Sequence, residues 1–199
     1  MGALVLVRHG QTEWSRAGRH TGRTDLPLTE EGERQARSVR PLLADHRFEL
    51  VLTSPLGRAV RTAALAGLGG ARTHSDLVEW DYGAYEGITT REIHRERPDW
   101  NLWTDGVPPG SEGFPGENPE QVGARTDRVL HDLSSALERG DVALVAHSHL
   151  LRVLTARRLG LPPSGGALFR LDTGSVSTLG TEHGRPVLTS WNRSWDPPE

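Results

Sequence analysis

Apolar runs of strand length recur along the chain, and each one ends in polar residues. Residues 3–7, 50–53 and 142–146 are mostly apolar, the pattern of strands that are buried on both faces of a sheet. The residues that follow these runs are RHG, SP and HSH. Ligands of parallel sheets bind beyond the carboxyl ends of the strands, so these polar residues predict the place of a site.

A helical pattern follows two of these runs. Ser54 is suited to cap a helix whose first residue is Pro55, and this alanine-rich helix is expected to reach Leu68 before two glycines stop it. After 142–146, a second helical pattern ends at Gly160. The chain therefore repeats a unit of strand, turn and helix.

Two more helices are predicted outside these units. Residues 29–40 have helical spacing of apolar positions, and Pro41 shortens the helix. Residues 118–121 resemble a capping box with proline at the first helical position, and an apolar stripe continues as far as Leu137. We expect a long helix there.

Alternating buried strands and amphipathic helices predict an α/β fold, a three-layer α/β/α sandwich with a mostly parallel central sheet. Residues 176–179 and 187–190 predict two strands that form a hairpin at one edge of that sheet. The length fits a single domain over residues 1–199. Residues 104–117 are rich in Gly, Pro, Ser and acidic residues without periodicity, and we interpret this loop as a lid over the site.

Composition narrows the class of protein. Hydrophobic residues make up 35% and charged residues 25% of the chain, with a formal net charge of -3, which favours a soluble protein over a disordered tail or a nucleic-acid-binding surface. The chain has no cysteine, which excludes disulfides, thiolate zinc sites and a cysteine nucleophile. The run at 3–7 is far shorter than a membrane span, so we expect a cytoplasmic protein without a membrane anchor.

All of the fixed positive charge is carried by arginine, because the sequence contains no lysine. This excludes Schiff-base chemistry and the lysine of a nucleotide-binding loop. A planar, always-charged guanidinium is well suited to holding anions. At the end of the first strand, Arg8 can neutralise a phosphate while His9 attacks phosphorus through a ring nitrogen. Gly10 has no side chain, so the backbone there can approach the phosphate closely.

Four separated blocks of the sequence resemble the histidine phosphatase superfamily, which includes the cofactor-dependent phosphoglycerate mutases. The blocks are LVRHGQTEWS with GRHTGRTDLPLTEEG, then SPLGRA, LVEWDYGAYEG and VAHSHLLR. Within the family they are most similar to small acid phosphatases and to the sedoheptulose-bisphosphatase-like branch. The resemblance implies a phosphatase that hydrolyses small phosphomonoesters through a phosphohistidine.

The resemblance also implies roles for five residues. His9 corresponds to the nucleophile, Glu79 to the proton donor, and Arg8, Arg58 and His147 to the pocket that holds the phosphate. Such cationic groups can share the charge that builds on the phosphoryl oxygens. A free glutamate titrates near ~4.3, so a glutamate that donates a proton requires either a pocket that raises its pKa or an enzyme that prefers acid pH, as in acid phosphatases.

Five further residues are candidates for substrate binding. Ser15 stands where many relatives have asparagine, and Ser148 stands where glycine is usual. Thr21 and Gly22 match a segment that contacts the substrate in relatives, and Tyr82 is a candidate pocket wall.

Other functions remain open at this point. A phosphoglycerate mutase is the first alternative, although Thr90 replaces a lysine that mutases carry and the 104–117 segment is acidic. A non-catalytic relative that binds phosphorylated ligands is the second. A metal site at His147 and His149 lacks a suitable carboxylate set, so we expect neither a metal nor a cofactor. The expected partner is a small phosphorylated metabolite, and the sequence leaves a homodimer open.

Overall fold

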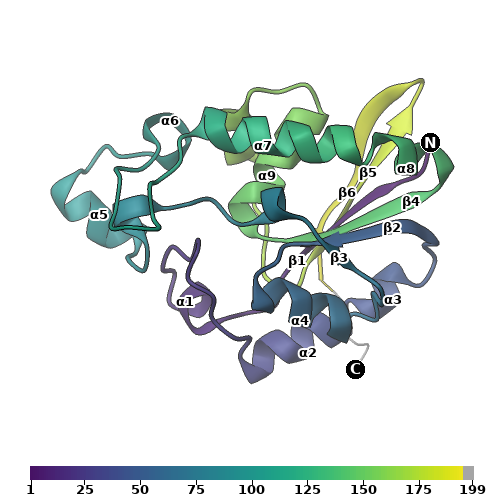
Figure 1. Ribbon diagram of the computed structural model, residues 1–199, viewed down its shortest axis with the longest axis horizontal. Helices are drawn as coiled ribbons and strands as arrows, with labels where there is room; N and C mark the ends of the chain where they lie inside the picture. The colour runs from purple at the N-terminus through teal and green to yellow at the C-terminus, as the bar shows by residue number, and fades with distance from the viewer. Residues whose placement is uncertain (195–199) are drawn as a thin grey trace.

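The structure, a computed structural model that describes residues 1–194, is organised around one six-stranded sheet (Figure 1). The strands are β1 (Leu4–Arg8), β2 (Phe48–Thr53), β3 (Arg72–Thr73), β4 (Asp141–Ala146), β5 (Val176–Glu182) and β6 (Arg185–Arg193). Their order across the sheet is β3-β2-β4-β1-β5-β6. The first four are parallel, whereas β5 and β6 run antiparallel at one edge, so the predicted mostly parallel sheet and edge hairpin are confirmed.

Helices cover both faces of the sheet (Figure 1). On one side lie α2 (Glu30–Ser38), α3 (Arg40–Leu43) and α4 (Gly57–Leu65), and on the other lie α7 (Pro119–Asp132), α8 (Ser134–Arg139) and α9 (Ser148–Arg158). Leu4 and Leu6 of β1 pack into one apolar cluster, and Val5 and Val7 pack into the other. Because successive side chains of a strand point to opposite faces, this alternation confirms that β1 is buried on both sides.

The remaining helices are short. They are α1 (Glu13–Arg16), α5 (Thr90–Glu96), α6 (Leu102–Asp105) and the 3₁₀ turns η1 (Ser75–Leu77), η2 (Gly83–Tyr85) and η3 (Pro163–Leu168). Helices α1, α5 and α6 lie toward the side of the sheet where β1 ends (Figure 1). The connecting segments around them form the walls of the site.

The predicted capping box of α7 is confirmed. The side-chain oxygen of Asn118 accepts from the backbone of Gln121 at 2.9 Å, and the Gln121 side chain accepts from the backbone of Asn118 at 2.8 Å. The predicted long helix divides into α7 and α8 at Leu133. The shortening of the helix at 29–40 is also confirmed, because Pro41 falls in the first turn of the separate helix α3.

The prediction for α4 was wrong at both ends. The helix begins at Gly57, its N-cap is Leu56 without a side-chain cap, and it ends at Leu65. The Ser54 hydroxyl instead lies 2.8 Å from Nε2 of His147. The same hydroxyl accepts from the backbone of Leu56 at 3.3 Å, so Ser54 holds the turn before the helix and also bonds a tertiary partner.

The segment at 104–117 differs in part from the predicted loop. Its first two residues belong to α6, and the remainder is irregular. This remainder packs on the segment after Glu79, where the Pro108 carbonyl accepts from the backbone of Ala84 at 3.0 Å. Closure of this segment over the site stays a prediction.

Candidate active site

Three neighbouring parallel strands deliver polar residues to the same edge of the sheet. His9 follows β1, His147 follows β4 and Ser54 follows β2. The strands are in register at this edge, because Arg8 pairs with Ala146 in the ladder between β1 and β4. The polar residues predicted to form a site are therefore brought together, as the geometry of a parallel sheet requires.

His9 is 4% exposed and is held at both its backbone and its ring. Its backbone nitrogen donates to the Ala146 carbonyl at 3.0 Å. Its Nδ1 lies 2.7 Å from the Gly10 carbonyl oxygen, which can only accept, so Nδ1 carries the proton and Nε2 carries a lone pair. Burial lowers the pKa of His9 well below 6.5, and the charges of Arg58 and Arg8 add to this shift, so the ring is neutral.

Gly10 allows the chain to pass close to α2. A Cβ added at this position would lie 2.1 Å from the carbonyl oxygen of Gly32. The sequence analysis assigned this closeness to a bound phosphate, whereas the structure places the backbone of a neighbouring helix there.

Arg8, which is partly buried, and Arg58, which is fully buried, are the two cations whose charges act on His9. Arg8 donates through Nη1 to the Leu171 carbonyl at 2.5 Å, and its Nε has no hydrogen-bond partner among the described residues. Arg58 donates to the backbone carbonyls of the segment at 21–24. Burial lowers the pKa of both guanidinium groups, yet arginine stays charged in proteins.

His147 lies beside His9, with 5.1 Å between the ring centroids. Arg58 Nε donates to its Nδ1 at 3.3 Å, so the proton of the neutral ring is on Nε2, which donates to the Ser54 hydroxyl at 2.8 Å. The pKa of His147 is lowered well below 6.5, first by burial and then by the charge of Arg58. Both ring nitrogens therefore have protein partners.

Glu79 faces these groups across the pocket and is 4% exposed. Its Oε1 accepts from the backbone of Trp80 at 2.8 Å and of Leu150 at 2.9 Å, and its Oε2 accepts from the backbone of His149 at 3.1 Å. The last two donors belong to the first turn of α9, whose N-cap provides no side-chain cap. A carboxylate from a distant segment thus occupies the amino-terminal end of that helix.

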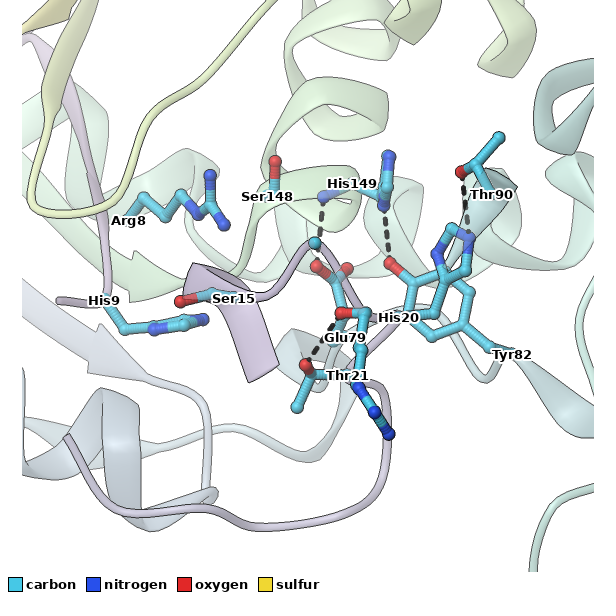
Figure 2. Close-up of a pocket in the computed structure, with 12 residues that line it drawn as sticks. Arg8, His9, Ser15, His20, Thr21, Glu79, Tyr82, Thr90, Ser148 and His149 are labelled. Atoms are coloured by element: carbon cyan, nitrogen blue, oxygen red, sulfur yellow. Dashed lines mark hydrogen bonds between the residues drawn. The ribbon is translucent and has the colours of Figure 1, made fainter. Parts of the chain in front are cut away.

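Figure 2 shows the His9 ring and the Arg8 guanidinium pointing from the same side toward the middle of the pocket, where Glu79 lies. The pocket has a volume of about 220 Å³. It is lined by Arg8, His9, Ser15, Gly18, Arg19, His20, Thr21, Glu79, Tyr82, Thr90, Ser148 and His149. Of the ten predicted site residues, seven lie in this lining, whereas Gly22, Arg58 and His147 lie outside it.

Most predicted substrate-binding hydroxyls already have partners within the protein. Ser15 exchanges hydrogen bonds with Thr12 in the capping box of α1, and the Thr21 hydroxyl donates to the Arg19 carbonyl at 3.1 Å. The backbone nitrogen of Gly22 donates to the Glu86 carboxylate at 3.0 Å.

Sequence reasoning missed two histidines in the pocket wall. The Tyr82 hydroxyl lies 2.5 Å from Nδ1 of His149, and Nε2 of His20 lies 3.3 Å from the Thr90 hydroxyl. Burial lowers the pKa of His20 to about 4 and that of His149 well below 6.5, and it raises the pKa of Tyr82. This wall is therefore neutral and able to form hydrogen bonds. The HSH and GRH segments contain these histidines, but only the fold places them opposite His9.

A second hollow adjoins the pocket and shares Arg19 and Thr90 with it. Arg91 and Arg95 of α5 also line this hollow, and its single carboxylate, Glu92, is engaged in the capping box of α5. The fold therefore places three arginines at the margin of the site.

Comparison with known proteins identifies the family. The model of the histidine phosphatase superfamily (branch 1) matches residues 4–194. The chain belongs to this superfamily. As a member, the chain is a phosphoric monoester hydrolase. The phosphohistidine mechanism is general to the family.

Individual relatives are similar over most of the chain. An acid phosphatase of Mycobacterium tuberculosis is 40% identical over 91% of this chain and 87% of its own length. The sedoheptulose 1,7-bisphosphatase of Saccharomyces cerevisiae is 35% identical over 79% of this chain and 67% of its own length. The solved structure of a functionally characterised open reading frame of Mycobacterium tuberculosis superposes with a TM-score of 0.91, at 37% identity, over 98% of this chain and 99% of that one.

The described residues show neither a metal-binding cluster nor a membrane-spanning helix. Residues 1–194 contain no group of three His, Asp or Glu side chains placed to hold a metal ion. His147 and His149 bond different partners rather than converging on one point. No helix in the described part of the chain has the length and apolar character to cross a membrane.

Proposed function

We propose that this phosphatase hydrolyses small phosphomonoesters whose leaving group is polar and uncharged where it contacts the pocket wall, using His9 as the nucleophile and Glu79 as the acid and base. The observation that carries the proposal is the buried, neutral His9, whose Nε2 lone pair shares one pocket with Arg8 and the Glu79 carboxyl group. These are the parts that phosphoryl transfer to an imidazole requires.

The reaction proceeds in two steps. In the first, His9 Nε2 forms a bond to phosphorus while the bond from phosphorus to the leaving oxygen breaks, and the protonated Glu79 gives its proton to that oxygen. In the second, a water oxygen attacks phosphorus, the bond from nitrogen to phosphorus breaks, and Glu79 takes a proton from the water. Alcohol and inorganic phosphate leave, and both side chains return to their starting forms.

Three groups are proposed to hold the phosphate. Arg8 lines the pocket and points its guanidinium into it, and its Nε has no hydrogen-bond partner among residues 1–194. His147 lies next to His9, and Arg58 contacts its Nδ1 at a long 3.3 Å, a hydrogen bond that a bound dianion can replace. Once the dianion takes that donor, Nδ1 of His147 can take up a proton and donate to the phosphate as well. Their positive charge and donors would balance the charge on the equatorial oxygens.

The character of the pocket wall favours a small leaving group that is polar and uncharged where it meets the wall. His20, Tyr82 and His149 are neutral at ordinary pH, because burial lowers the pKa of each histidine and raises that of the tyrosine. Such groups form hydrogen bonds to hydroxyls. A cavity of about 220 Å³ fits a small phosphorylated metabolite such as a sugar phosphate.

One experiment separates hydrolysis from the mutase and from a non-catalytic ligand-binding protein. The purified protein is incubated with p-nitrophenyl phosphate, and separately with 3-phosphoglycerate with and without bisphosphoglycerate. We expect phosphate release from the first and negligible isomerisation of the second. Efficient cofactor-dependent isomerisation would support the mutase, and inertness towards every phosphomonoester would support a binding protein.

A rapid-quench measurement tests the intermediate directly. Labelled phosphorus should attach to His9 during turnover, and a His9→Ala variant should lose both the label and nearly all activity. Turnover without labelled protein would rule out His9 as the nucleophile. We further propose a single domain, a cytoplasmic location and a lid role for the 104–117 segment, each testable on the purified protein or in cells.

A further inference from the structure

A buried ion pair holds the backbone of the Glu79 segment without lining the pocket. Arg125 of α7 bonds both carboxylate oxygens of Glu117, with 2.8 Å between Nε and Oε1 and 2.9 Å between Nη2 and Oε2. The two side chains are 6% and 13% exposed. This bidentate geometry fixes the orientation of the guanidinium plane.

The remaining donors of Arg125 are all used on the chain around Glu79. Nη1 donates to the Asp76 carbonyl at 2.9 Å and to the Val78 carbonyl at 2.7 Å, and Nη2 donates to the Glu79 carbonyl at 3.1 Å. A guanidinium has five N–H groups, and all five have acceptors here. One side chain therefore sets the path of the backbone that leads into Glu79.

Glu117 holds the backbone that leaves Glu79. Its Oε2 accepts from the Asp81 backbone nitrogen at 2.8 Å, and its own backbone nitrogen donates to the Asp81 carbonyl at 3.0 Å. Its carbonyl accepts from the indole nitrogen of the buried Trp80 at 2.9 Å. The chain is thus fixed on both sides of Glu79.

Stability alone does not account for a charged residue at this position. Arg125 lies one helical turn from the buried Val122 and Val129, on the side of α7 that faces the core. A buried ion pair often stabilises a fold no more than apolar residues of similar size would, because both charges lose their hydration. What apolar residues cannot supply is a set of directed hydrogen bonds to the backbone next to Glu79.

We propose that Arg125 and Glu117 are positioning residues for the acid and base of the reaction. They fix the segment from Asp76 to Asp81 so that the Glu79 carboxyl group stays within reach of the leaving oxygen. This inference rests on the proposed role of Glu79. A shift of the carboxyl group by about 1 Å would slow proton transfer by up to ~10²-fold while leaving the phosphate pocket in place.

The leaving group provides the readout, because only some leaving groups need a proton. An alkoxide, as from glycerol 2-phosphate, leaves only if Glu79 protonates it, whereas the phenolate of 2,4-dinitrophenyl phosphate leaves unprotonated. A residue that positions Glu79 should therefore affect the first substrate and spare the second. General loosening of the fold would affect both.

The test compares kcat/KM for these two substrates, because this ratio reports the step that forms the phosphohistidine, whereas the later attack of water needs Glu79 as the base with either substrate. For Arg125→Met we expect kcat/KM on glycerol 2-phosphate to fall about 10- to 100-fold, with kcat/KM on the dinitrophenyl ester within about 3-fold of the unaltered protein. Arg157→Met is the matched control, since it removes a bidentate ion pair with Asp127 of α7, the helix of Arg125, at the surface and away from the Glu79 segment. It should leave both rates unchanged.

Glu117→Gln and Arg125→Lys keep the side-chain volume and provide the result if Arg125→Met does not fold. Both variants should lose activity on glycerol 2-phosphate selectively, by a smaller factor than Arg125→Met. Equal losses on the two substrates in a folded variant, or no loss on glycerol 2-phosphate, would overturn the inference. Failure of the proposed function itself would look different, because His9→Ala would then retain activity on the dinitrophenyl ester.

Discussion

At the scale of single residues, burial and one hydrogen bond together determine what His9 can do. The Gly10 carbonyl places the ring proton on Nδ1, which leaves the lone pair on Nε2. Burial and the two neighbouring arginines keep the ring from taking a second proton, because they lower its pKa. The same cations that attract a phosphate therefore keep the nucleophile in its reactive form.

The pH dependence of the rate should report this shift. A protonated imidazole has no lone pair to attack phosphorus, so activity is lost only when the pH falls through the pKa of His9 in the folded protein. Since that pKa lies well below 6.5, kcat/KM for p-nitrophenyl phosphate should not decline as the pH falls from neutrality through 6.5. An acid limb centred near 6.5 in the pH profile would contradict this expectation.

At the scale of elements, Glu79 connects the loop that precedes η2 to the first turn of α9. The carboxylate accepts from His149 and Leu150 in that turn, where the helix otherwise lacks a side-chain cap. The proposed proton donor therefore also stabilises the helix that follows His147.

Replacement of Glu79 should consequently lower both activity and stability. Glu79→Gln removes the proton donor, so kcat on glycerol 2-phosphate should fall about 10²- to 10⁴-fold. It also places an amide group against backbone N–H groups, which should cost about 1–2 kcal/mol in urea unfolding.

A cap outside the pocket lining serves as the comparison. Asn101→Ala removes the exposed side chain that caps α6, so it should cost about 1 kcal/mol of stability with activity retained. Full activity of Glu79→Gln on glycerol 2-phosphate would exclude Glu79 as the donor.

Strands and helices that are marked by a pattern of neighbouring residues were predictable from the sequence. The apolar runs before His9 and His147 identified buried strands, and the capping box at Asn118 located the start of α7. Because parallel strands align their carboxyl ends, the place of the site followed from the same runs. The predicted start of α4 was wrong because the chain at Ser54 to Leu56 forms a turn, in which the Ser54 hydroxyl accepts from the Leu56 backbone and also bonds the distant His147.

The pocket wall and the ion pair behind Glu79 could not be predicted in this way. His20 and His149 are more than a hundred residues apart, and only the packed fold places their rings 6.4 Å from each other. Arg125 did carry a signal, since a charged residue among the core-facing positions of an amphipathic helix indicates a buried partner. Its partner, Glu117, lay in a segment interpreted only as a lid.

At the scale of the whole molecule, the distribution of arginines extends the site beyond the pocket. Arg19, Arg91 and Arg95 line the hollow that adjoins it. Substrates that carry a second phosphate should therefore be attracted more strongly than monophosphates, and salt should weaken the difference.

Paired sugar phosphates test this charge effect. The double variant Arg91→Gln, Arg95→Gln should lower kcat/KM for fructose 1,6-bisphosphate about 3- to 10-fold relative to fructose 6-phosphate at low ionic strength. Arg72→Gln, which removes an exposed arginine on β3, is the control and should leave the ratio unchanged. An unchanged ratio in the double variant would show that the hollow does not select the second phosphate.

The buried histidines should also make stability depend on pH. His9, His147, His149 and His20 all have a lowered pKa in the folded protein, so below 6.5 the unfolded chain binds more protons than the folded one. The free energy of unfolding should therefore decrease as the pH falls from 6.5, and for His20 the decrease continues to about 4.

Urea midpoints measured at a series of pH values check this prediction. A His20→Gln variant should show a weaker dependence, since one of the shifted groups is gone. A midpoint that is constant or rises on acidification would contradict it.

The contact between Gly10 and Gly32 has a consequence for how the site tolerates change. A methyl group on Gly10 would lie 2.1 Å from the Gly32 carbonyl oxygen, and one on Gly32 would lie 2.1 Å from the Gln11 carbonyl oxygen. Main chain meets main chain here, without side chains between. This backbone contact limits how far the chain that carries His9 can move toward α2, so we expect substitutions in the pocket wall to change selectivity while the imidazole keeps its height above the sheet.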